Sequence, residues 1–382
     1  MLKESEVSKM NIYKKITEKI IEKMEDAENK GTVFRWVKPF DITESVRFPC
    51  NYESLTPYNG INRLLVEPDE YITFHQLNQF NNRNKGENFR IRAGSKGFPI
   101  IYYNWDFIKD NDGNIKTDDD GNPLKRPFVR YYTVFSRQDI VNEYGENLYS
   151  KFPTKHFSHE EMIKIISSEL NRFAEMVFDY CQQNGLKLEI INDGTSAYFS
   201  FNDGVIRVPS IVNFNSVYEY VSTISHELIH STIVSLGRCT PQELKDTKKY
   251  SQEELVAEIG ANMLVSNFMI PDDSEIDNNI AYIQHWRSYL ENDSTKSVIL
   301  YAARQAQKAC DLITNNRIRE HILNRIDIDP EAYNKAPDYI KNDYLFATQL
   351  VNKNPILWDI LPEDVKSEIK NERNDTDELL IL

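Results

Sequence analysis

The sequence contains little cysteine and no long apolar segment. Its 382 residues include four cysteines, which lie far apart and form no C-x-x-C pair. This spacing argues against a disulfide framework and against a cysteine zinc site, and it is typical of a reducing compartment. No run of about 18 apolar residues occurs, and no apolar segment follows the charged N-terminus, so we expect neither a membrane span nor a signal peptide. The composition predicts a cytoplasmic protein without a membrane partner.

Positive charge is also scarce, since the formal net charge is −14. Residues 1–150 carry 22 Lys and Arg against 23 Asp and Glu, whereas the rest of the chain carries 23 against 36. A polyanion would therefore meet the first part of the chain more readily than the second. Because even the first part is not basic overall, nucleic-acid binding there would depend on local cations and on stacking.

The length and the apolar content are sufficient for more than one hydrophobic core. The chain exceeds a typical single domain, and 40% of its residues are hydrophobic. We expect an α+β protein of three parts. A small mixed N-terminal domain covers residues 1–145, a second domain with a short antiparallel sheet and a metal-binding helix covers 155–316, and a helical, polar extension covers 317–382.

The most specific motif is the run His226-Glu227-Leu228-Ile229-His230, which lies in an apolar pattern typical of a helix. Residues four apart lie on one face of a helix, so His226 and His230 can hold one metal ion. Glu227 can then act as general base for a water molecule. Such a run also occurs by chance, but its helical setting favours a catalytic zinc site with one Zn²⁺ per chain, a third protein ligand and one open position.

Two carboxylates four residues apart, Glu254 and Glu258, follow on the next predicted helix. We expect Glu254 to be the third ligand and Glu258 to orient a ligand histidine through its other ring nitrogen. An alternative stays open, because Ser251 and Glu254 have the spacing of a capping box, in which Glu254 would bind the start of its own helix. Glu258 and Glu253 are then the alternative ligands.

The segment before the motif predicts a long helix and three short strands. The helix ends at Gly185, and the strands cover residues 186–192, 196–201 and 205–208, with Asp-Gly turns between them. A strand beside the metal site can hold an extended substrate by edge pairing, and 196–201 is our candidate. Tyr198 or Tyr218 is the candidate hydrogen-bond donor to a developing oxyanion.

The first domain mixes aromatic and basic side chains. We expect a helix over 8–30, a helix start at 71–76, and strands over 99–103 and 130–135 joined by a long loop over 109–126. Single-stranded nucleic acid binds where bases stack on rings and cations follow the phosphates. The candidate contacts are Trp36, Tyr58, Asn62, Arg63, Arg92, Lys96, Arg130 and Tyr132. The alternative is that these aromatic residues pack the core, as strand aromatics usually do.

Taken in order, these motifs resemble the ArdC-type antirestriction proteins of mobile elements. The resemblance is carried by W-V-K-P-F at 36–40, Y-N-G-I-N at 58–62, T-F-H-Q at 73–76, the H-E-L-x-H run and E-E-L-V-A-E at 253–258. It implies an N-terminal domain that binds single-stranded DNA and a zincin-like metallopeptidase domain that acts on an unknown protein or peptide. The family usually has Trp-Thr after the second histidine, where this chain has Ser231-Thr232.

The motifs and the resemblance together predict an antirestriction-like protein that is encoded by a mobile element and acts in plasmid conjugation. We expect it to bind single-stranded DNA and to carry a zinc-dependent, peptide-hydrolysing site. Two alternatives remain open. One is a zinc metalloprotease that does not bind DNA, and the other is a non-catalytic DNA-binding protein whose metal is structural.

Overall fold

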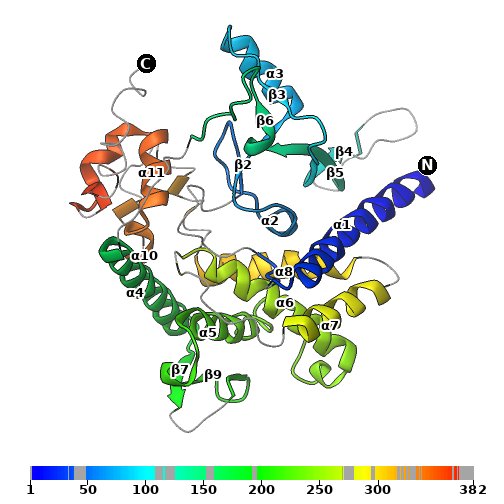
Figure 1. The fold of residues 1–382 in the computed structure, drawn as a ribbon. Helices are drawn as coiled ribbons and strands as arrows, with labels where there is room; N and C mark the ends of the chain where they lie inside the picture. Colours follow the sequence, from blue (N-terminus) through cyan, green and yellow to red (C-terminus); the bar gives the residue numbers. More distant parts are fainter. Residues whose placement is uncertain are drawn as a thin grey trace. The chain divides into compact units, whose positions relative to one another are not determined.

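The computed structural model describes most of the chain in two compact units (Figure 1). The first unit comprises Met1–Phe34, Phe48–Lys151 and Ile280–Leu300, and the second comprises Arg35–Arg47, Phe152–Asn279 and Tyr301–Leu382. The described residues are 2–32, 34–37, 49–107, 115–116, 125–151, 159–191, 196–268, 270, 279–293, 297–315, 319, 322–323, 326, 333–334, 336, 338–363, 365–367 and 369. Their mixture of helices and short sheets confirms the predicted α+β class.

The first unit begins with helix α1 (Leu2–Lys30), which confirms the helix predicted over 8–30 and extends it toward the N-terminus. Ile12, Ile16, Ile20 and Met24 are buried, and their spacing of four places them on one face of the helix. The helix ends at Gly31, whose φ of 61° is the left-handed conformation that glycine adopts readily after a helix. The amphipathic pattern thus predicted the helix, and Gly31 predicted its end.

The core of the first unit is a four-stranded sheet of order β1-β2-β5-β4. Strands β4 (Phe98–Phe107) and β5 (Lys125–Ser136) form the predicted antiparallel hairpin, and most of its 109–126 loop lies outside the described residues. The other elements of this part are β1 (Cys50–Asn51), α2 (Ile61–Leu65), β2 (Glu70–Thr73), α3 (Phe74–Arg83), β3 (Arg90–Ile91), η1 (Arg137–Asp139) and β6 (Ile140–Val141).

The helix start predicted at 71–76 was placed too early. Tyr71 and Ile72 belong to strand β2 and pair with β5, and helix α3 begins only at Phe74. The Thr73 side chain accepts a hydrogen bond from the Gln76 backbone N–H, and the Gln76 side-chain oxygen accepts one from the Thr73 backbone N–H. This capping box fixes the boundary at Thr73, so the strand residues before it are excluded from the helix.

Helix α7 (Asn279–Asn292), far along the chain, also belongs to the first unit. Its Arg287 forms an ion pair with Glu28 of α1 at 3.0 Å, and Gln284 donates a hydrogen bond to the same carboxylate. Two helices separated by some 250 residues of sequence are therefore joined by polar contacts.

The second unit opens with the long helix α4 (His159–Gln183), followed by a three-stranded sheet. Strands β7 (Lys187–Ile191), β8 (Tyr198–Ser200) and β9 (Val205–Pro209) confirm the three predicted strands. The strand order is β7-β9-β8, and β7 runs parallel to β9, so the prediction of a purely antiparallel sheet was wrong. β9 is buried along most of its length, and an apolar strand of this kind favours the central position.

Helix α5 (Val217–Ser231) packs beside strands β8 and β9, and helix α6 (Thr247–Val265) packs closely against α5. A Cβ atom at Gly260 of α6 would lie 2.8 Å from Cδ1 and Cγ1 of Ile229 on α5, so only glycine allows this approach. Helix α8 (Val298–Ile313) contacts the same glycine, because the Cys310 thiol lies 3.3 Å from the Gly260 carbonyl oxygen. The remaining named elements are η2 (Ile211–Asn213), η3 (Glu243–Lys245), α10 (Asp338–Lys341), α11 (Tyr344–Lys353) and η5 (Pro355–Ile360).

We expect the Gly260→Ala substitution to destabilise the protein. The clash with Ile229 should exceed the gain in helix propensity, for a net loss of about 1–2 kcal/mol in the free energy of unfolding, measured with urea. In an Ile229→Ala background the added methyl group meets no large side chain, so the same substitution should be neutral or stabilising there. Equal losses in both backgrounds would contradict the close packing of α5 and α6.

None of the helices in the described part of the chain is long and apolar enough to cross a membrane.

Candidate metal centre

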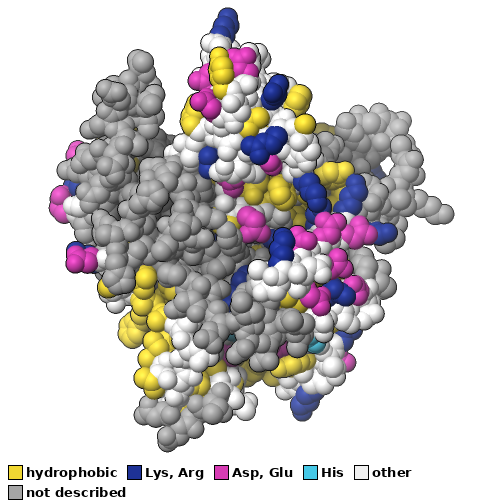
Figure 2. Space-filling view, in the orientation of Figure 1, with side chains coloured by type: hydrophobic (Ala, Val, Ile, Leu, Met, Phe, Trp, Pro, Cys, Tyr) yellow, Lys and Arg dark blue, Asp and Glu magenta, His cyan; other side chains and the backbone are white. Residues whose placement is uncertain are grey.

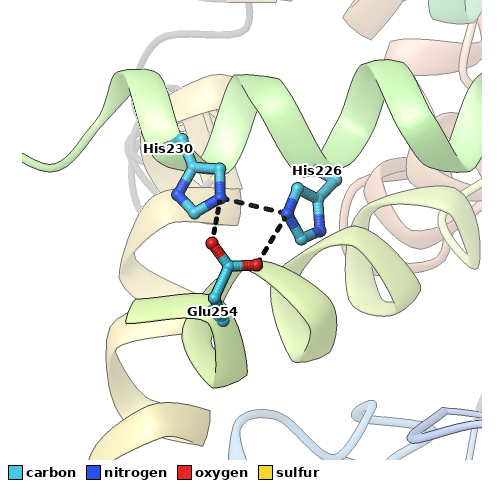
Figure 3. A group of neighbouring side chains, drawn as sticks. All are labelled: His226, His230 and Glu254. Carbon is cyan, nitrogen blue, oxygen red and sulfur yellow. Dashed lines mark hydrogen bonds and ion pairs between the residues drawn. The ribbon is translucent and has the colours of Figure 1, made fainter. Parts of the chain in front are cut away.

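The H-E-x-x-H run lies on helix α5, as its spacing predicts. Ser216 caps the start of the helix by accepting a hydrogen bond from the Glu219 backbone at 3.0 Å, and Val221, Ile224 and Leu228 anchor its apolar face in the core. The two histidines lie one turn apart with their Nε2 atoms 3.0 Å from each other (Figure 3). The buried face of α5 thus fixes the direction in which the imidazoles point.

Glu254 reaches this pair from helix α6 (Figure 3). Its two carboxylate oxygens lie 3.5 Å from His226 Nε2 and 3.5 Å from His230 Nε2. One ligand atom from each of the three residues lies within 4.8 Å of the others. Donors that are each about 2.0–2.1 Å from one tetrahedral zinc ion lie about 3.4 Å apart, so this donor set fits zinc in both chemistry and spacing.

The site is open to solvent on one side. The exposed fractions of the His226, His230 and Glu254 side chains are 20%, 15% and 25%. Within the described residues, the cluster brings together three ligating side chains. Three protein ligands and an accessible side are typical of a catalytic zinc site, whereas structural sites are closed by a fourth protein ligand.

The capping alternative for Glu254 was wrong. Helix α6 begins at Thr247, and its N-cap is Asp246, which accepts a hydrogen bond from the Lys249 backbone at 2.9 Å. Ser251 therefore lies inside the helix, and Glu254 is in its second turn, where the backbone N–H groups bond to carbonyls of the preceding turn. This leaves the Glu254 carboxylate available to face the histidines.

The Glu227 carboxyl group is buried beside the sheet. It accepts a hydrogen bond from the backbone N–H of Phe199 in strand β8. Burial is the largest influence on this group and raises the pKa of Glu227 above its usual value, against the opposing effect of His230 and His226. A carboxylate with a raised pKa is a better proton acceptor near neutral pH, which suits a general base.

His226 lies between several carboxylates. Burial lowers its pKa, but the hydrogen bond with Glu254 and the charges of Glu258 and Glu227 outweigh burial, and the net direction is upward. Glu258 Oε1 is 4.0 Å from His226 Nδ1, which is the side of the ring away from Glu254. Glu258 is therefore placed where an orienting carboxylate is needed, and its role stays a prediction.

A tyrosine that was not among the predicted oxyanion donors interacts with a candidate ligand. Tyr250, one turn before Glu254 on α6, shares a side-chain hydrogen bond with that carboxylate. Burial, and after it this hydrogen bond, raises the pKa of Tyr250. Burial also acts to raise the pKa of Glu254, but the hydrogen bonds and charges of its partners, His226 and Tyr250 among them, outweigh burial and lower it. Tyr198 lies against Arg207, and Tyr218 is buried against Arg35. The spacing of four between Tyr250 and Glu254 was the available signal.

Two further residues of the site were not recognised in their roles. Glu253, named only as an alternative ligand, lies 3.4 Å from His230 Nδ1, and Arg238 forms an ion pair with it. Arg238 lies in the loop after α5, where no sequence spacing points to the metal helices. Its role follows only from the packed structure.

Several of the candidate DNA contacts are buried. Trp36, Tyr58 and Arg63 are 1%, 7% and 6% exposed. The Asn62 amide is paired with the backbone of Ile101, donating to its carbonyl and accepting from its N–H at 2.7 Å each. These positions favour the packing alternative for the four residues. A buried ring offers no face to a base, and a buried cation or a paired amide is not accessible to a nucleic acid.

The remaining candidates lie at the surface of the first unit or in its hairpin. Arg92 and Lys96 are exposed, and Tyr132 is half-buried with its ring 5.7 Å from that of Tyr102. Arg130 lies in β5, and its side chain is outside the described residues. Basic and acidic side chains are intermixed on the face of the molecule drawn in Figure 2.

Comparison with known families matches a large part of each unit. Residues 10–135 match the N-terminal domain of the anti-restriction factor ArdC, and residues 179–305 match a zincin-like metallopeptidase domain. The chain is an ArdC-like protein. This combination confirms the resemblance stated from the motifs, and the second match includes α5, α6 and all three candidate ligands.

Relatives of the ArdC-like chain are matched along most of their own length. An uncharacterized protein, y4eC, of Sinorhizobium fredii (strain NBRC 101917 / NGR234) is 21% identical over 306 residues, which cover 79% of this chain and 91% of that protein. Crystal structures of the antirestriction protein ArdC from plasmid R388, one metal-free and one Mn(II)-bound, are 24% identical and give TM-scores of 0.52 and 0.51. Each covers 80% of this chain and 97% of the plasmid protein, which supports a shared fold.

Proposed function

We propose that this ArdC-like chain is an antirestriction-type protein whose second unit binds a divalent metal ion, Zn²⁺ by preference, and hydrolyses peptide bonds. The observation that carries the proposal is the convergence of His226, His230 and Glu254 on one point, with Glu227 beside them. The Mn(II)-bound structure of the plasmid protein supports a divalent ion in this fold.

The residues around the site have complementary tasks in such a reaction. When bound, zinc would acidify a water molecule and polarise the scissile carbonyl. Glu227 would take a proton from the attacking water and pass it to the leaving amine, for which its raised pKa is suited. The Tyr250 hydroxyl, which donates its one proton to Glu254 in the free protein, would turn from Glu254 to the carbonyl oxygen as negative charge develops there.

Strand β8 would hold the substrate. It is one of the two outer strands of the described sheet of order β7-β9-β8, and its Phe199 N–H contacts the Glu227 carboxylate. An extended peptide that pairs with this edge would run past the catalytic residue with its main chain fixed by backbone hydrogen bonds. The substrate class is therefore a protein with an extended segment rather than a folded surface.

The purified protein tests this function directly. We expect about one zinc ion per chain, and hydrolysis of an unfolded protein such as casein that stops on treatment with a chelator and returns with zinc. Stoichiometric zinc without hydrolysis of any unfolded protein would favour the alternative of a non-catalytic protein whose metal is structural. Absence of bound zinc or manganese would contradict the metal proposal itself.

We propose in addition that the first unit binds single-stranded DNA through its exposed side chains. Arg92 and Lys96 are exposed, and the rings of Tyr102 and Tyr131 on the hairpin are 36% and 44% exposed. Exposed rings can stack on bases while the cations contact phosphates. The buried candidates of the first unit, Tyr58 among them, would then support this surface from its core.

We expect the double substitution Arg92→Ala/Lys96→Ala to weaken binding of an oligonucleotide by the full-length protein. The slope of log affinity against log salt should flatten by about 0.7 for each lost phosphate contact to a single strand. The control is Lys30→Ala, an exposed cation at the end of α1. An unchanged salt slope would remove these two residues from the interface, and absence of any salt-dependent binding by the wild type would favour a metalloprotease that does not bind DNA.

A further inference from the structure

A buried ion pair lies directly behind the candidate metal centre. Arg238 Nε donates to Glu253 Oε2 at 2.9 Å, and Nη2 donates to Glu253 Oε1 at 2.7 Å. The exposed fractions of the two side chains are 1% and 4%. A two-bond contact between a guanidinium and a carboxylate fixes both groups in one plane, so the position of the carboxylate is well defined.

The pair is also tied to the helix that carries the histidines. Arg238 Nη1 donates to Thr232 Oγ1 at 2.7 Å, and Nη2 donates to the backbone carbonyl of Ile229 at 2.8 Å. Ile229 and Thr232 are close neighbours of His230 at the C-terminal end of α5. Arg238 therefore connects the end of this helix to Glu253 on α6.

Glu253 in turn faces the ring nitrogen of His230 that points away from the other ligands. Its Oε1 is 3.4 Å from His230 Nδ1, and Figure 3 shows this nitrogen on the side of the ring away from His226. A carboxylate paired with a guanidinium accepts hydrogen bonds and does not donate them, so the shared hydrogen must be on Nδ1. The lone pair of the neutral ring is then on Nε2, 3.5 Å from Glu254.

We propose that Arg238 and Glu253 form a positioning pair for His230, which keeps its proton on Nδ1 and turns the lone pair of Nε2 toward the metal ion. The inference rests on the proposed role of His230 as a ligand and deepens it. Glu253 and Arg238 do not touch the metal or the substrate in this scheme. They act through the histidine, as outer-shell partners of metal-bound imidazoles do.

Paired substitutions separate positioning from simple packing. Arg238→Met/Glu253→Met replaces the ion pair by apolar side chains of similar length, which avoids an unpaired buried charge and often preserves folding. Arg238→Met/Glu253→Gln restores a neutral acceptor opposite His230 Nδ1. The matched control is Arg172→Met/Glu169→Met, which removes another buried Arg–Glu pair of the same unit, 2.8 Å apart on α4.

Two measurements on the full-length chain test the proposal. In the metal-free protein, ¹⁵N NMR should place the proton of neutral His230 on Nδ1 in the wild type, and this preference should be lost in the Met/Met variant. Affinity for Zn²⁺ and Co²⁺, measured by chelator competition, should fall about 10–100-fold in that variant, as for other outer-shell partners. The Met/Gln variant should recover most of the loss, and the α4 control should keep wild-type affinity.

A wild-type spectrum with the proton on Nε2 overturns the proposal without any variant. A folded Met/Met variant with unchanged metal affinity also overturns it, because the pair would then serve packing alone. If the wild type binds neither ion, the metal proposal fails, but the tautomer of His230 in the metal-free wild type still decides whether the pair positions the ring. If the Met/Met variant does not fold, the wild-type spectrum decides in the same way.

Discussion

The Glu227→Gln variant should keep its metal ion and lose peptide hydrolysis. Glutamine has the size of glutamate but cannot accept a proton at neutral pH, so the ligands His226, His230 and Glu254 stay in place while the general base is gone. General-base catalysis contributes about 10²–10⁴-fold to such reactions, and we expect turnover to fall by at least that factor. The measurement is hydrolysis of an unfolded protein at equal zinc content.

The control for this variant is Glu175→Gln, the same chemical change at an exposed position of α4. It should hydrolyse the substrate at the wild-type rate. If Glu227→Gln retained wild-type turnover with its zinc bound, the role assigned to Glu227 would be refuted. If it lost both zinc and turnover, Glu227 would act on the metal centre rather than on the proton.

The Glu227→Gln variant also tests whether the metal site is needed for antirestriction activity. Protection of unmodified incoming plasmid DNA from restriction can be compared between the wild type and Glu227→Gln in cells. Loss of protection with zinc still bound would make hydrolysis the mechanism and would start the search for a protein substrate. Full protection would show that DNA binding by the first unit is sufficient for the biological effect. The second unit would then have a different function.

The His230→Ala variant should lose its metal ion. His230 supplies one of three ligand atoms and lies 3.0 Å from the second, so its removal leaves two donors with no replacement. We expect a loss of affinity greater than the roughly 10–100-fold that accompanies removal of an outer-shell partner. Zinc at 100 times the wild-type dissociation constant should stabilise the wild type by about 2.7 kcal/mol and the variant not at all.

The control is His285→Ala, which removes an exposed histidine of α7 that packs against Trp286. Its affinity for zinc and its stabilisation by zinc should equal those of the wild type. A His230→Ala protein with full zinc occupancy at wild-type affinity would exclude His230 from the site. A chelator should lower the melting temperature of the wild type and of His285→Ala, and should leave that of His230→Ala unchanged.

The sequence by itself determined the features that depend on neighbours along the chain. The two histidines must share a face of α5 because residues four apart do so on any helix. The amphipathic spacing of α1 gave its buried face, and Gly31 gave its end. The ordered motifs were sufficient to state the ArdC resemblance, which two family matches confirmed.

Competing local signals left one helix start open in the sequence and misplaced another. Ser251 and Glu254 have the spacing of a capping box, but Asp246 caps the helix first, and a helix has only one start. Tyr71 and Ile72 precede a genuine capping box, yet pairing with β5 holds them in a strand. A local pattern cannot state which of two candidate boundaries the rest of the chain will stabilise.

The tertiary structure alone decided how the carboxylates of α6 share their roles. Glu253, Glu254 and Glu258 have the same chemistry, and only the close crossing of α5 and α6 at Gly260 places Glu254 between the histidines and Glu253 behind His230. Arg238 joins them from a loop, and the parallel pairing of β7 with β9 depends on which strand is buried. The physical reason is that burial and ligand geometry arise from contacts between segments that are distant in sequence. The energies of these contacts cannot be inferred from any one segment alone.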